Sequence, residues 1–472
     1  MIGLKKVELM KFDPLDYVID ANCSLESALL KIEANHQGFL FTIDENDSVI
    51  GLATDGDIRR ALLAGVALGD SISQCANTDF FWVDIDTPRE AILKRLDGDY
   101  EFVPLLDENK KLSYIITHDY LPLRDEEPVY VRARAPVRVS FGGGGSDLTH
   151  YFIENSGAVI NAAISIYSHA TLRLRSDSRI NISSLDLNDT LSASDLDEAI
   201  NHAGKFGLIT SVLKVVSPNY GFDLYLHSDF SVGSGLGGSA AIAAVVLGCF
   251  NMLRKDRWDN HELAELAFQA ERIHLGVAGG WQDQYATVFG GFNFIEFDMD
   301  QHVVNPIRMD LCTILELEES LVLCDTGILH SSGDIHKDQK ETMKSQKVSD
   351  LVKENVELTH SIKKHLLRGR ISDFGSELNR AWELKRNFSS SISSTEIDEI
   401  YQGALDNGAS GGKLLGAGGG GYFLFHVSPF EKHQLCTHLK SKGLEVKTFK
   451  FEPYGVQAWS VRDKQSNKSL WD

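Results

Sequence analysis

The sequence has no excess of basic residues. Its 472 residues include 46 Lys and Arg against 67 Asp and Glu, which gives a formal net charge of -21. This charge repels nucleic acid phosphates and anionic lipid unless a local basic patch intervenes, and no Lys/Arg cluster large enough to form one is present. We therefore expect neither nucleic acid nor a membrane surface as a partner.

Long apolar runs and paired cysteines are also missing. No run reaches the ~18 residues that a membrane span requires, and the stretch MIGLKKVELMKF lacks the apolar core of a signal peptide. The six cysteines include no CxxC pair or His-rich neighbourhood that would suggest zinc, so reduced thiols are expected at Cys23, Cys75, Cys249, Cys312, Cys324 and Cys436. These absences favour a cytoplasmic protein.

The composition that is present, 43% hydrophobic and 24% charged, is typical of a globular chain, and its length predicts two or three domains. The N-terminal part contains an internal repeat. SLESALLKIEA, GFLFTID, VIGLAT and DGDIRRALLAG predict helix, strand, strand and helix, and TPREAILKRL, YEFVPLLD, LSYIIT and HDYLP follow in the same order.

This repeat resembles a tandem CBS-domain pair, an α/β module that senses adenine nucleotides, and we assign residues 1–126 to it. The resemblance implies that Thr54 and Asp57 contact the ribose and phosphate of a regulatory nucleotide. In the second half, Asp119 follows Thr117 by two positions, one fewer than the family spacing. A purely structural role, in packing or in a homodimer, is the alternative.

Three glycine clusters follow an acidic linker: FGGGGSD, GSGLGGSAA and GAGGGGYF. The second matches G-x-G-x-x-G, but no strand ending in an acidic residue follows it, as a dinucleotide fold requires. A Walker A Lys-Ser/Thr pair and the protein-kinase VAIK and HRD elements are absent too. The loop leads instead into an apolar helix, then into a second helix capped by Asp259 or Asn260. A helix N-terminus with glycines before it favours phosphate, and a flexible turn is the structural alternative.

In their order, APVRVSFGGGGSD, SVGSGLGGSAA and KLLGAGGGGYF resemble the three motifs of the GHMP kinases, with Ser231 in place of a frequent proline and Gly238 in place of a serine. The resemblance implies an α+β fold of two lobes and the cofactors ATP and Mg²⁺. We expect an N-terminal lobe like ribosomal protein S5 domain 2 over residues 127–300, and a ferredoxin-like C-terminal lobe over residues 301–472.

Within that superfamily, the segments AERIHLGVAGGWQDQYATVFGGFNFIEF, HSSGDIHKDQ and AWELKRNFSSSISSTEIDEIY resemble D-glycero-D-manno-heptose 7-phosphate kinases of GDP-heptose synthesis. This branch phosphorylates the anomeric hydroxyl, so the implied product is the 1,7-bisphosphate. Two alternatives stay open. One is a kinase of an unphosphorylated sugar such as fucose or galactose, and the other is a nucleotide sensor whose kinase half is inactive.

Five residues are expected to carry the chemistry. Asp283 would accept the proton of the anomeric hydroxyl, and Arg138 would stabilise the developing negative charge. Glu271, on the shoulder of an apolar helical stripe, and Ser239 would hold Mg²⁺. Asp147 would bind sugar hydroxyls. Each residue taken alone also has a structural interpretation. The acidic residues could lie at a helix edge or cap, and Arg138 could be an exposed strand residue.

Other contacts are expected from the loops and from cations. The ATP phosphates would meet Gly233, Ser234, Gly235, Leu236, Gly237, Gly238, Ser239, Ala240, Gly418 and Gly419. The sugar would meet Gly144, Gly145, Ser146, Gly280 and Lys385. For the far phosphate of a sugar phosphate the sequence does not separate Lys385 from Lys337, Lys340 and Arg386.

Overall fold

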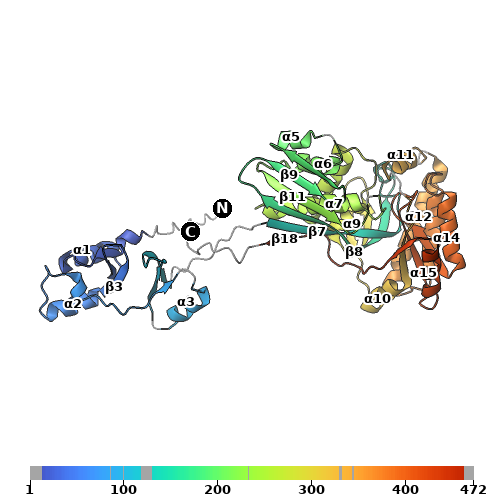
Figure 1. The fold of residues 1–472 in the computed structure, drawn as a ribbon. Helices are drawn as coiled ribbons and strands as arrows, with labels where there is room; N and C mark the ends of the chain where they lie inside the picture. The colour runs from blue at the N-terminus through green and yellow to red at the C-terminus, as the bar shows by residue number, and fades with distance from the viewer. Residues whose placement is uncertain are drawn as a thin grey trace. The chain divides into compact units, whose positions relative to one another are not determined.

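The computed structural model describes residues 13–84, 87–98, 100–118, 130–202, 204–231, 233–328, 332–342 and 345–461. The chain divides into two compact units, Met1–Glu127 with Asp463–Asp472, and Pro128–Arg462 (Figure 1). In the described ranges, no helix combines the length and the apolar character that crossing a membrane requires.

The first unit contains two copies of one motif, each a three-stranded sheet with helices. The first copy consists of η1 (Pro14–Asp16), β1 (Val18–Asp20), α1 (Leu25–Asn35), β2 (Phe39–Ile43), β3 (Val49–Thr54), α2 (Asp55–Leu63) and η2 (Ile72–Gln74). The second consists of β4 (Val83–Asp84), α3 (Arg89–Leu96), β5 (Phe102–Leu106) and β6 (Leu112–Thr117). In each copy the middle strand pairs parallel with the first strand and antiparallel with the third.

The two sheets pack through aromatic side chains, with the rings of Phe39 and Phe102 stacked 3.9 Å apart. This arrangement confirms the internal repeat. The segment that contains Asp119 lies outside the described residues.

The second unit is built on an eight-stranded sheet. Its strands are β7 (Tyr130–Gly142), β8 (Gly157–Leu174), β9 (Ile180–Ser184), β10 (Asp189–Ala193), β11 (Phe222–Ser228), β12 (Phe292–Phe297), β13 (His302–Pro306) and β18 (Gln457–Val461). Beside it lie α4 (Thr149–Phe152), α5 (Leu196–Ile200), α6 (Gly207–Val216), α7 (Gly238–Leu253), α8 (Asn260–Phe268), the π-helical η3 (Gln269–His274) and α9 (Gln282–Phe289).

Helix α7 is apolar on nearly every side because it packs against strands β7 and β8 on one side and helices α6, α8 and α9 on the others. A helix in such a position has no solvent face to make polar. Its burial fixes the N-terminal end of α7 and the glycine loop before it.

A second sheet, in the order β15-β16-β14-β17, is antiparallel throughout. Its strands are β14 (Leu321–Asp325), β15 (Ala409–Leu414), β16 (Tyr422–Val427) and β17 (Glu445–Lys447). The helices around it are α10 (Leu311–Ser320), α11 (Ser332–Thr342), α12 (Gln346–Leu367), α13 (Phe374–Arg386), α14 (Thr395–Asp406) and α15 (Lys432–Ser441). Buried residues of both sheets form one continuous core.

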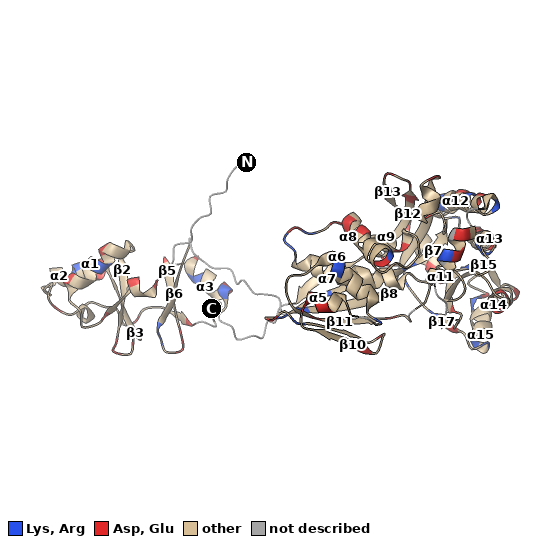
Figure 2. Cartoon of the chain, turned by 90° about the horizontal axis from the view of Figure 1, so that it is seen from above, with Lys and Arg blue, Asp and Glu red and all other residues tan. Residues whose placement is uncertain are grey.

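The expected lobe boundary between residues 300 and 301 needs correction. Strands β13 and β18 lie beyond it, yet both belong to the eight-stranded sheet. Strand β18 returns from the C-terminal part of the chain to pair with β7. Strand β7 pairs with β8 along one edge, which leaves its other edge free for β18 at residues 130–134. Figure 2 shows acidic and basic residues interspersed along the described elements rather than gathered into one basic region.

Candidate functional site

The three glycine clusters meet at one cleft in the second unit. Its lining includes Gly144 and Gly145 of the first cluster, residues 233–239 of the second in part, and Gly416 and Ala417 of the third. The second and third loops touch backbone to backbone. A Cβ on Gly416 would lie 2.6 Å from the Gly235 carbonyl oxygen, and Gly416 has a φ of +66°. Only glycine therefore permits this approach.

The second loop presents the N-terminus of α7 to the cleft. No side chain caps this end, where Gly237 adopts a φ of 81°. Its backbone N–H groups are thus available to an anion, which the helix dipole also favours. The lining residues here are Gly233, Ser234, Gly235, Gly237, Gly238 and Ser239.

Four residues of the expected phosphate contacts, Leu236, Ala240, Gly418 and Gly419, do not line the cleft. Leu236 and Ala240 are buried in the protein, not on the cleft wall. Gly418 packs against Ile392, and the N–H of Gly419 donates to the Ile392 carbonyl at 2.8 Å. These two glycines anchor the third loop, while the preceding Gly416 and Ala417 face the cleft.

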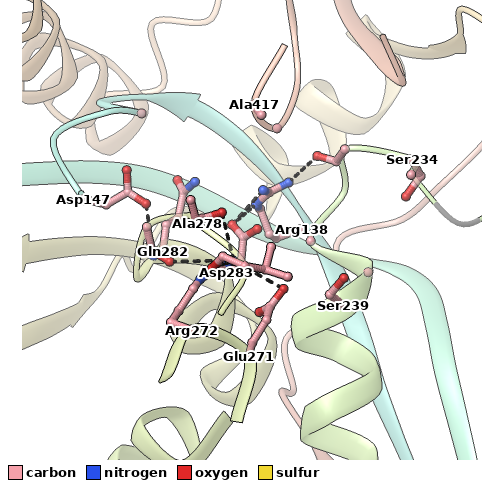
Figure 3. Close-up of a pocket in the computed structure, with 18 of the residues that line it drawn as sticks. Arg138, Asp147, Ser234, Ser239, Glu271, Arg272, Ala278, Gln282, Asp283 and Ala417 are labelled. Atoms are coloured by element: carbon pink, nitrogen blue, oxygen red, sulfur yellow. Dashed lines mark hydrogen bonds and ion pairs between the residues drawn. The ribbon is translucent and has the colours of Figure 1, made fainter. Parts of the chain in front are cut away.

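Asp283 and Arg138 form the centre of the site (Figure 3). Asp283 Oδ1 accepts from Arg138 Nε at 2.8 Å and lies 2.6 Å from Nη2. Nη1 of Arg138 donates to the Gly235 carbonyl at 2.7 Å, so the buried guanidinium ties this carboxylate to the second glycine loop. Within the described residues, Oδ2 of Asp283 has no hydrogen-bond donor and remains available to a ligand.

Asp147 lies on the opposite side of Asp283 from Glu271 in the view of Figure 3. Its carboxylate accepts from the N–H groups of Gly145 at 3.0 Å and Gln282 at 3.2 Å. Burial, aided by the charge of Asp283, raises the pKa of Asp147, and these backbone hydrogen bonds oppose the rise. A Cβ on Gly280 would lie 1.9 Å from Asp147 Oδ2, so a side chain there would displace this carboxylate.

Ser146 does not face the cleft, in contrast to its expected sugar contact. It is fully buried, and its hydroxyl lies 2.8 Å from the Gly143 carbonyl and 3.1 Å from the Ala158 carbonyl. It also accepts from the Ala158 N–H at 3.1 Å. The hydroxyl therefore stabilises the first glycine loop instead.

Glu271 and Ser239 lie on the same wall of the cleft. Glu271 Oε2 accepts from Gln284 Nε2 at 2.7 Å, and Oε1 lies 3.4 Å from Arg272 Nη1. Burial raises the pKa of Glu271, whereas Arg272 and hydrogen bonds from Gln284 and Ser239 lower it. A carboxylate beside a hydroxyl is a donor set that fits Mg²⁺, which prefers oxygen ligands.

Of the candidate cations whose side chains the structure describes, only Lys385 lines the cleft. Its Nζ donates to the carbonyls of Leu414 at 3.0 Å and Gly416 at 2.5 Å. Burial, followed by the nearby charges of Lys413 and Arg138, holds the pKa of Lys385 well below its ordinary value. Arg386 instead pairs with Glu383 and Asp398, each at 3.3 Å. Lys337 does not line the cleft, and the side chain of Lys340 lies outside the described set.

Sequence reasoning missed several residues of the site. Lys413 is buried near Arg138 and Asp147, and burial together with Arg138 lowers its pKa to about 7. Gln282 accepts from the Ser140 hydroxyl at 2.9 Å, and Gln339 donates to the Ala417 carbonyl at 3.1 Å. Arg272 also lines the cleft. The only sequence signal was their position inside or beside the quoted motifs.

In the first unit, Thr54 and Asp57 bond to each other at the start of α2. Asp57 Oδ2 accepts from the Thr54 N–H at 2.9 Å and from its hydroxyl at 2.6 Å. The Asp57 N–H donates back to the hydroxyl at 3.2 Å. This reciprocal cap gives both residues a local structural role. Their contact with a nucleotide stays a prediction.

Comparison with known families supports the assignment of both units. Residues 207–291 match the GHMP kinases N terminal domain, residues 362–441 the GHMP kinases C terminal domain, and residues 7–64 a CBS domain. A D-glycero-alpha-D-manno-heptose 7-phosphate kinase of Campylobacter jejuni is 35% identical over 344 residues, covering 70% of this chain and 99% of that protein. A bifunctional fucokinase/GDP-fucose pyrophosphorylase of Arabidopsis thaliana is 27% identical, and the match spans 77% of this chain but 35% of that protein.

Solved structures agree. A D-glycero-D-manno-heptose 1-phosphate kinase from Bacteroides thetaiotaomicron has a TM-score of 0.60 and 28% identity, with 71% of this chain and 100% of that chain covered. A putative sugar kinase from Campylobacter jejuni has a TM-score of 0.59 and 32% identity, with the same coverage of both chains. The expected two-lobed α+β fold and its kinase class are thereby confirmed. The chain belongs to the GHMP kinase family, as a sugar kinase and phosphotransferase to a hydroxyl group, with a CBS domain at its N-terminus.

Proposed function

We propose that this protein transfers the γ-phosphate of ATP to the anomeric hydroxyl of D-glycero-D-manno-heptose 7-phosphate. The product would be the 1,7-bisphosphate, used for nucleotide-activated heptose in the cytoplasm. One observation carries the proposal: Asp283, held by Arg138 at 2.8 Å, lies in the cleft formed by the glycine loops and Asp147. The 35% identity to a heptose 7-phosphate kinase supports this choice of sugar.

The roles of the residues follow from their positions. The uncapped N-terminus of α7 would bind the ATP phosphates, with Glu271 and Ser239 as ligands of Mg²⁺. When bound, the ion would neutralise charge on the phosphates. Asp283 would accept the proton of the acceptor hydroxyl. An anomeric hydroxyl is more acidic than an ordinary alcohol, so a carboxylate is basic enough. Asp147 would orient the sugar through its hydroxyls.

Two buried lysines at or beside the cleft favour an acceptor that carries a phosphate. Arg138 is already paired with Asp283, while Lys385 and Lys413 lie nearby without a carboxylate of their own. Burial lowers the pKa of both lysines, and the negative charge of a bound phosphate would favour their protonated forms. In a chain of net charge -21, two such lysines beside the cleft indicate an anionic ligand. We assign the far phosphate of the sugar to Lys385.

We further propose that residues 1–126 form a tandem CBS pair whose first copy binds an adenine nucleotide at Thr54 and Asp57, with a homodimer through this unit as the structural alternative. The support is the CBS match over residues 7–64 and the shared topology of the two copies. Calorimetry of AMP binding to the whole chain and to Asp57→Asn measures this second nucleotide site, and equal binding by both proteins would contradict it.

An ADP-release assay tests the kinase proposal. It compares heptose 7-phosphate, unphosphorylated heptose, fucose and galactose at equal Mg-ATP. We expect the highest kcat/KM with heptose 7-phosphate. A higher value with fucose or galactose would instead identify a kinase of an unphosphorylated sugar, and no release with any sugar would indicate an inactive kinase half.

A further inference from the structure

We propose that Arg272 is a positioning residue, which holds the loop of residues 277–280 and through it fixes Asp283 in the cleft. The inference rests on the proposed function, since it concerns the residue assigned there as proton acceptor. Arg272 directly follows Glu271 on the π-helical segment η3. Its side chain is only 12% exposed.

The guanidinium of Arg272 contacts the loop at three carbonyls. Nη1 lies 3.4 Å from the carbonyl oxygen of Val277 and 3.3 Å from that of Ala278, and Nη2 lies 3.5 Å from that of Gly280. This loop has no helical or strand hydrogen bonding of its own. A planar group with several donors can span such a loop, which a lysine ammonium cannot do.

The loop is confined from its other side by Asp147. The N–H groups of Trp281 and Gln282 donate to the backbone carbonyl and to the carboxylate of Asp147, at 3.1 and 3.2 Å. A Cβ on Gly279 would lie 2.4 Å from Arg272 Cζ, and one on Gly280 would lie 1.9 Å from Asp147 Oδ2. The two glycines therefore let the loop pass between a guanidinium and a carboxylate.

This confinement sets the position of Asp283 because α9 begins at Gln282, directly after the loop. If Arg272 were only the charge partner of Glu271, fewer of its contacts would be explained. Its contact with Glu271 is a single one at 3.4 Å, whereas the loop is contacted at three carbonyls at similar distances. It also gives no reason for the missing Cβ at residue 279. The three carbonyl contacts and the two glycines are explained together by positioning of the loop.

Three variants of the whole chain test the inference: Arg272→Lys keeps the charge, Arg272→Met keeps the volume, and Arg272→Ala leaves a gap. We expect each to lower kcat by roughly 10- to 100-fold, since a displacement of about 1 Å at a reacting group can cost 10²-fold. Added guanidinium at low millimolar concentration should restore part of the activity of the Ala variant but not of the Met variant. Equal response of both variants, or kcat within twofold of the unmodified chain, would overturn the inference.

A spectroscopic measurement keeps the test independent of the reaction. The ring of Trp281 stacks on Phe268 with centroids 3.4 Å apart, and its Nε1 donates to Thr149 at 3.1 Å. The emission of Trp281 is obtained by difference from Trp281→Phe, without sugar or nucleotide. It should shift in Arg272→Lys and Arg272→Met and stay unchanged in Arg368→Met, an exposed position outside the cleft. An unchanged emission in both Arg272 variants would overturn the inference even if the chain used no sugar at all.

Discussion

Buried charged side chains of both signs lie in or beside the cleft. Lys385 and Lys413 are buried lysines near Asp147 and Asp283, while Glu271 lies on the wall that carries Ser239. Charge in such a place acts strongly because little water screens it. Substitutions that alter one charge and preserve shape therefore report on individual roles.

Lys385→Met should weaken recognition of the sugar phosphate. Loss of one charge-assisted contact of about 1.5–3 kcal/mol corresponds to a KM raised roughly 10- to 100-fold. Unphosphorylated sugar should be affected far less, since it has no far phosphate. Steady-state kinetics with both sugars measure the ratio, and Arg386→Met, at the adjacent position off the cleft, is the matched control. An unchanged ratio would remove Lys385 from phosphate recognition.

Glu271→Gln should raise the Mg²⁺ concentration needed for half-maximal rate. The amide keeps the size of the side chain but is a poorer ligand for a hard cation. Excess Mg²⁺ should recover part of the rate. A titration of rate against Mg²⁺ at fixed ATP checks this outcome, and an identical titration curve for the variant and the unmodified chain would exclude Glu271 as a ligand.

At the residue scale, the sequence predicts the centre of the site better than its edges. Asp283, Arg138, Asp147 and Glu271 stand at fixed places in motifs, and the fold brings them to one cleft. Leu236 and Gly418 stand in the same motifs but do not line the cleft, because Leu236 is buried in the core and Gly418 packs against Ile392. Arg272 could not be recognised from spacing, since its role depends on a loop that passes over it.

At the scale of elements, the second and third glycine loops pack so closely that a side chain would not fit between their backbones. The second and third loops lie against each other at Gly235 and Gly416, and both connect regular elements whose ends are fixed by the core. A side chain at this contact would separate the loops, because the atoms it meets belong to backbone.

Gly416→Ala should both destabilise the protein and raise the KM for ATP. Alanine would take a φ of +66° and place its Cβ 2.6 Å from the Gly235 carbonyl oxygen. Gly443→Ala is the control, since it has a φ of +78° with nothing within 4 Å of the added Cβ. The control should cost only the roughly 1–2 kcal/mol of left-handed backbone strain. Thermal unfolding and ATP kinetics compare them, and equal behaviour of the two variants would contradict the loop contact.

Thr54→Ala should destabilise the first unit by about 1 kcal/mol, because it removes the hydroxyl that accepts from the Asp57 N–H at the start of α2. Thr54→Ser retains the hydroxyl and should be close to neutral. Thermal unfolding of the full chain measures both variants. A loss as large in the Ser variant as in the Ala variant would show that the cap is not what Thr54 contributes.

Element order was predictable where it depends on local pattern. The repeat of residues 13–118 and the helix after Gly237 follow from periodicity, and Asp259 caps α8 as one of the two expected residues. The pairing of β18 with β7 was not predictable from the sequence, because it joins strands far apart in the chain and depends on which sheet edge is free in the folded protein. For the same reason the lobe boundary expected after residue 300 does not separate the two sheets.

The whole molecule joins two compact units that match different families. The two GHMP kinase matches, over residues 207–291 and 362–441, lie in the second unit. The CBS match, over residues 7–64, lies in the first unit. Catalysis is therefore assigned to the second unit, where every proposed catalytic group lies.

Asp283, as proton acceptor, is the residue on which the proposed kinase activity depends most. In Asp283→Asn the shape is kept and the basicity is lost, so kcat should fall by roughly 10²–10⁴-fold. The KM for ATP should change little, because the uncapped end of α7 and the glycine loops bind the phosphates separately. Asp310→Asn, the same change at a helix cap outside the cleft, is the control and should remain near full activity.

The decisive measurement is kcat of Asp283→Asn at saturating Mg-ATP and heptose 7-phosphate, made on protein whose thermal midpoint matches that of the unmodified chain. A loss of at least two orders of magnitude is the result predicted here. Turnover within a few-fold of the unmodified chain would contradict the assignment and leave positioning of the substrates alone to explain catalysis.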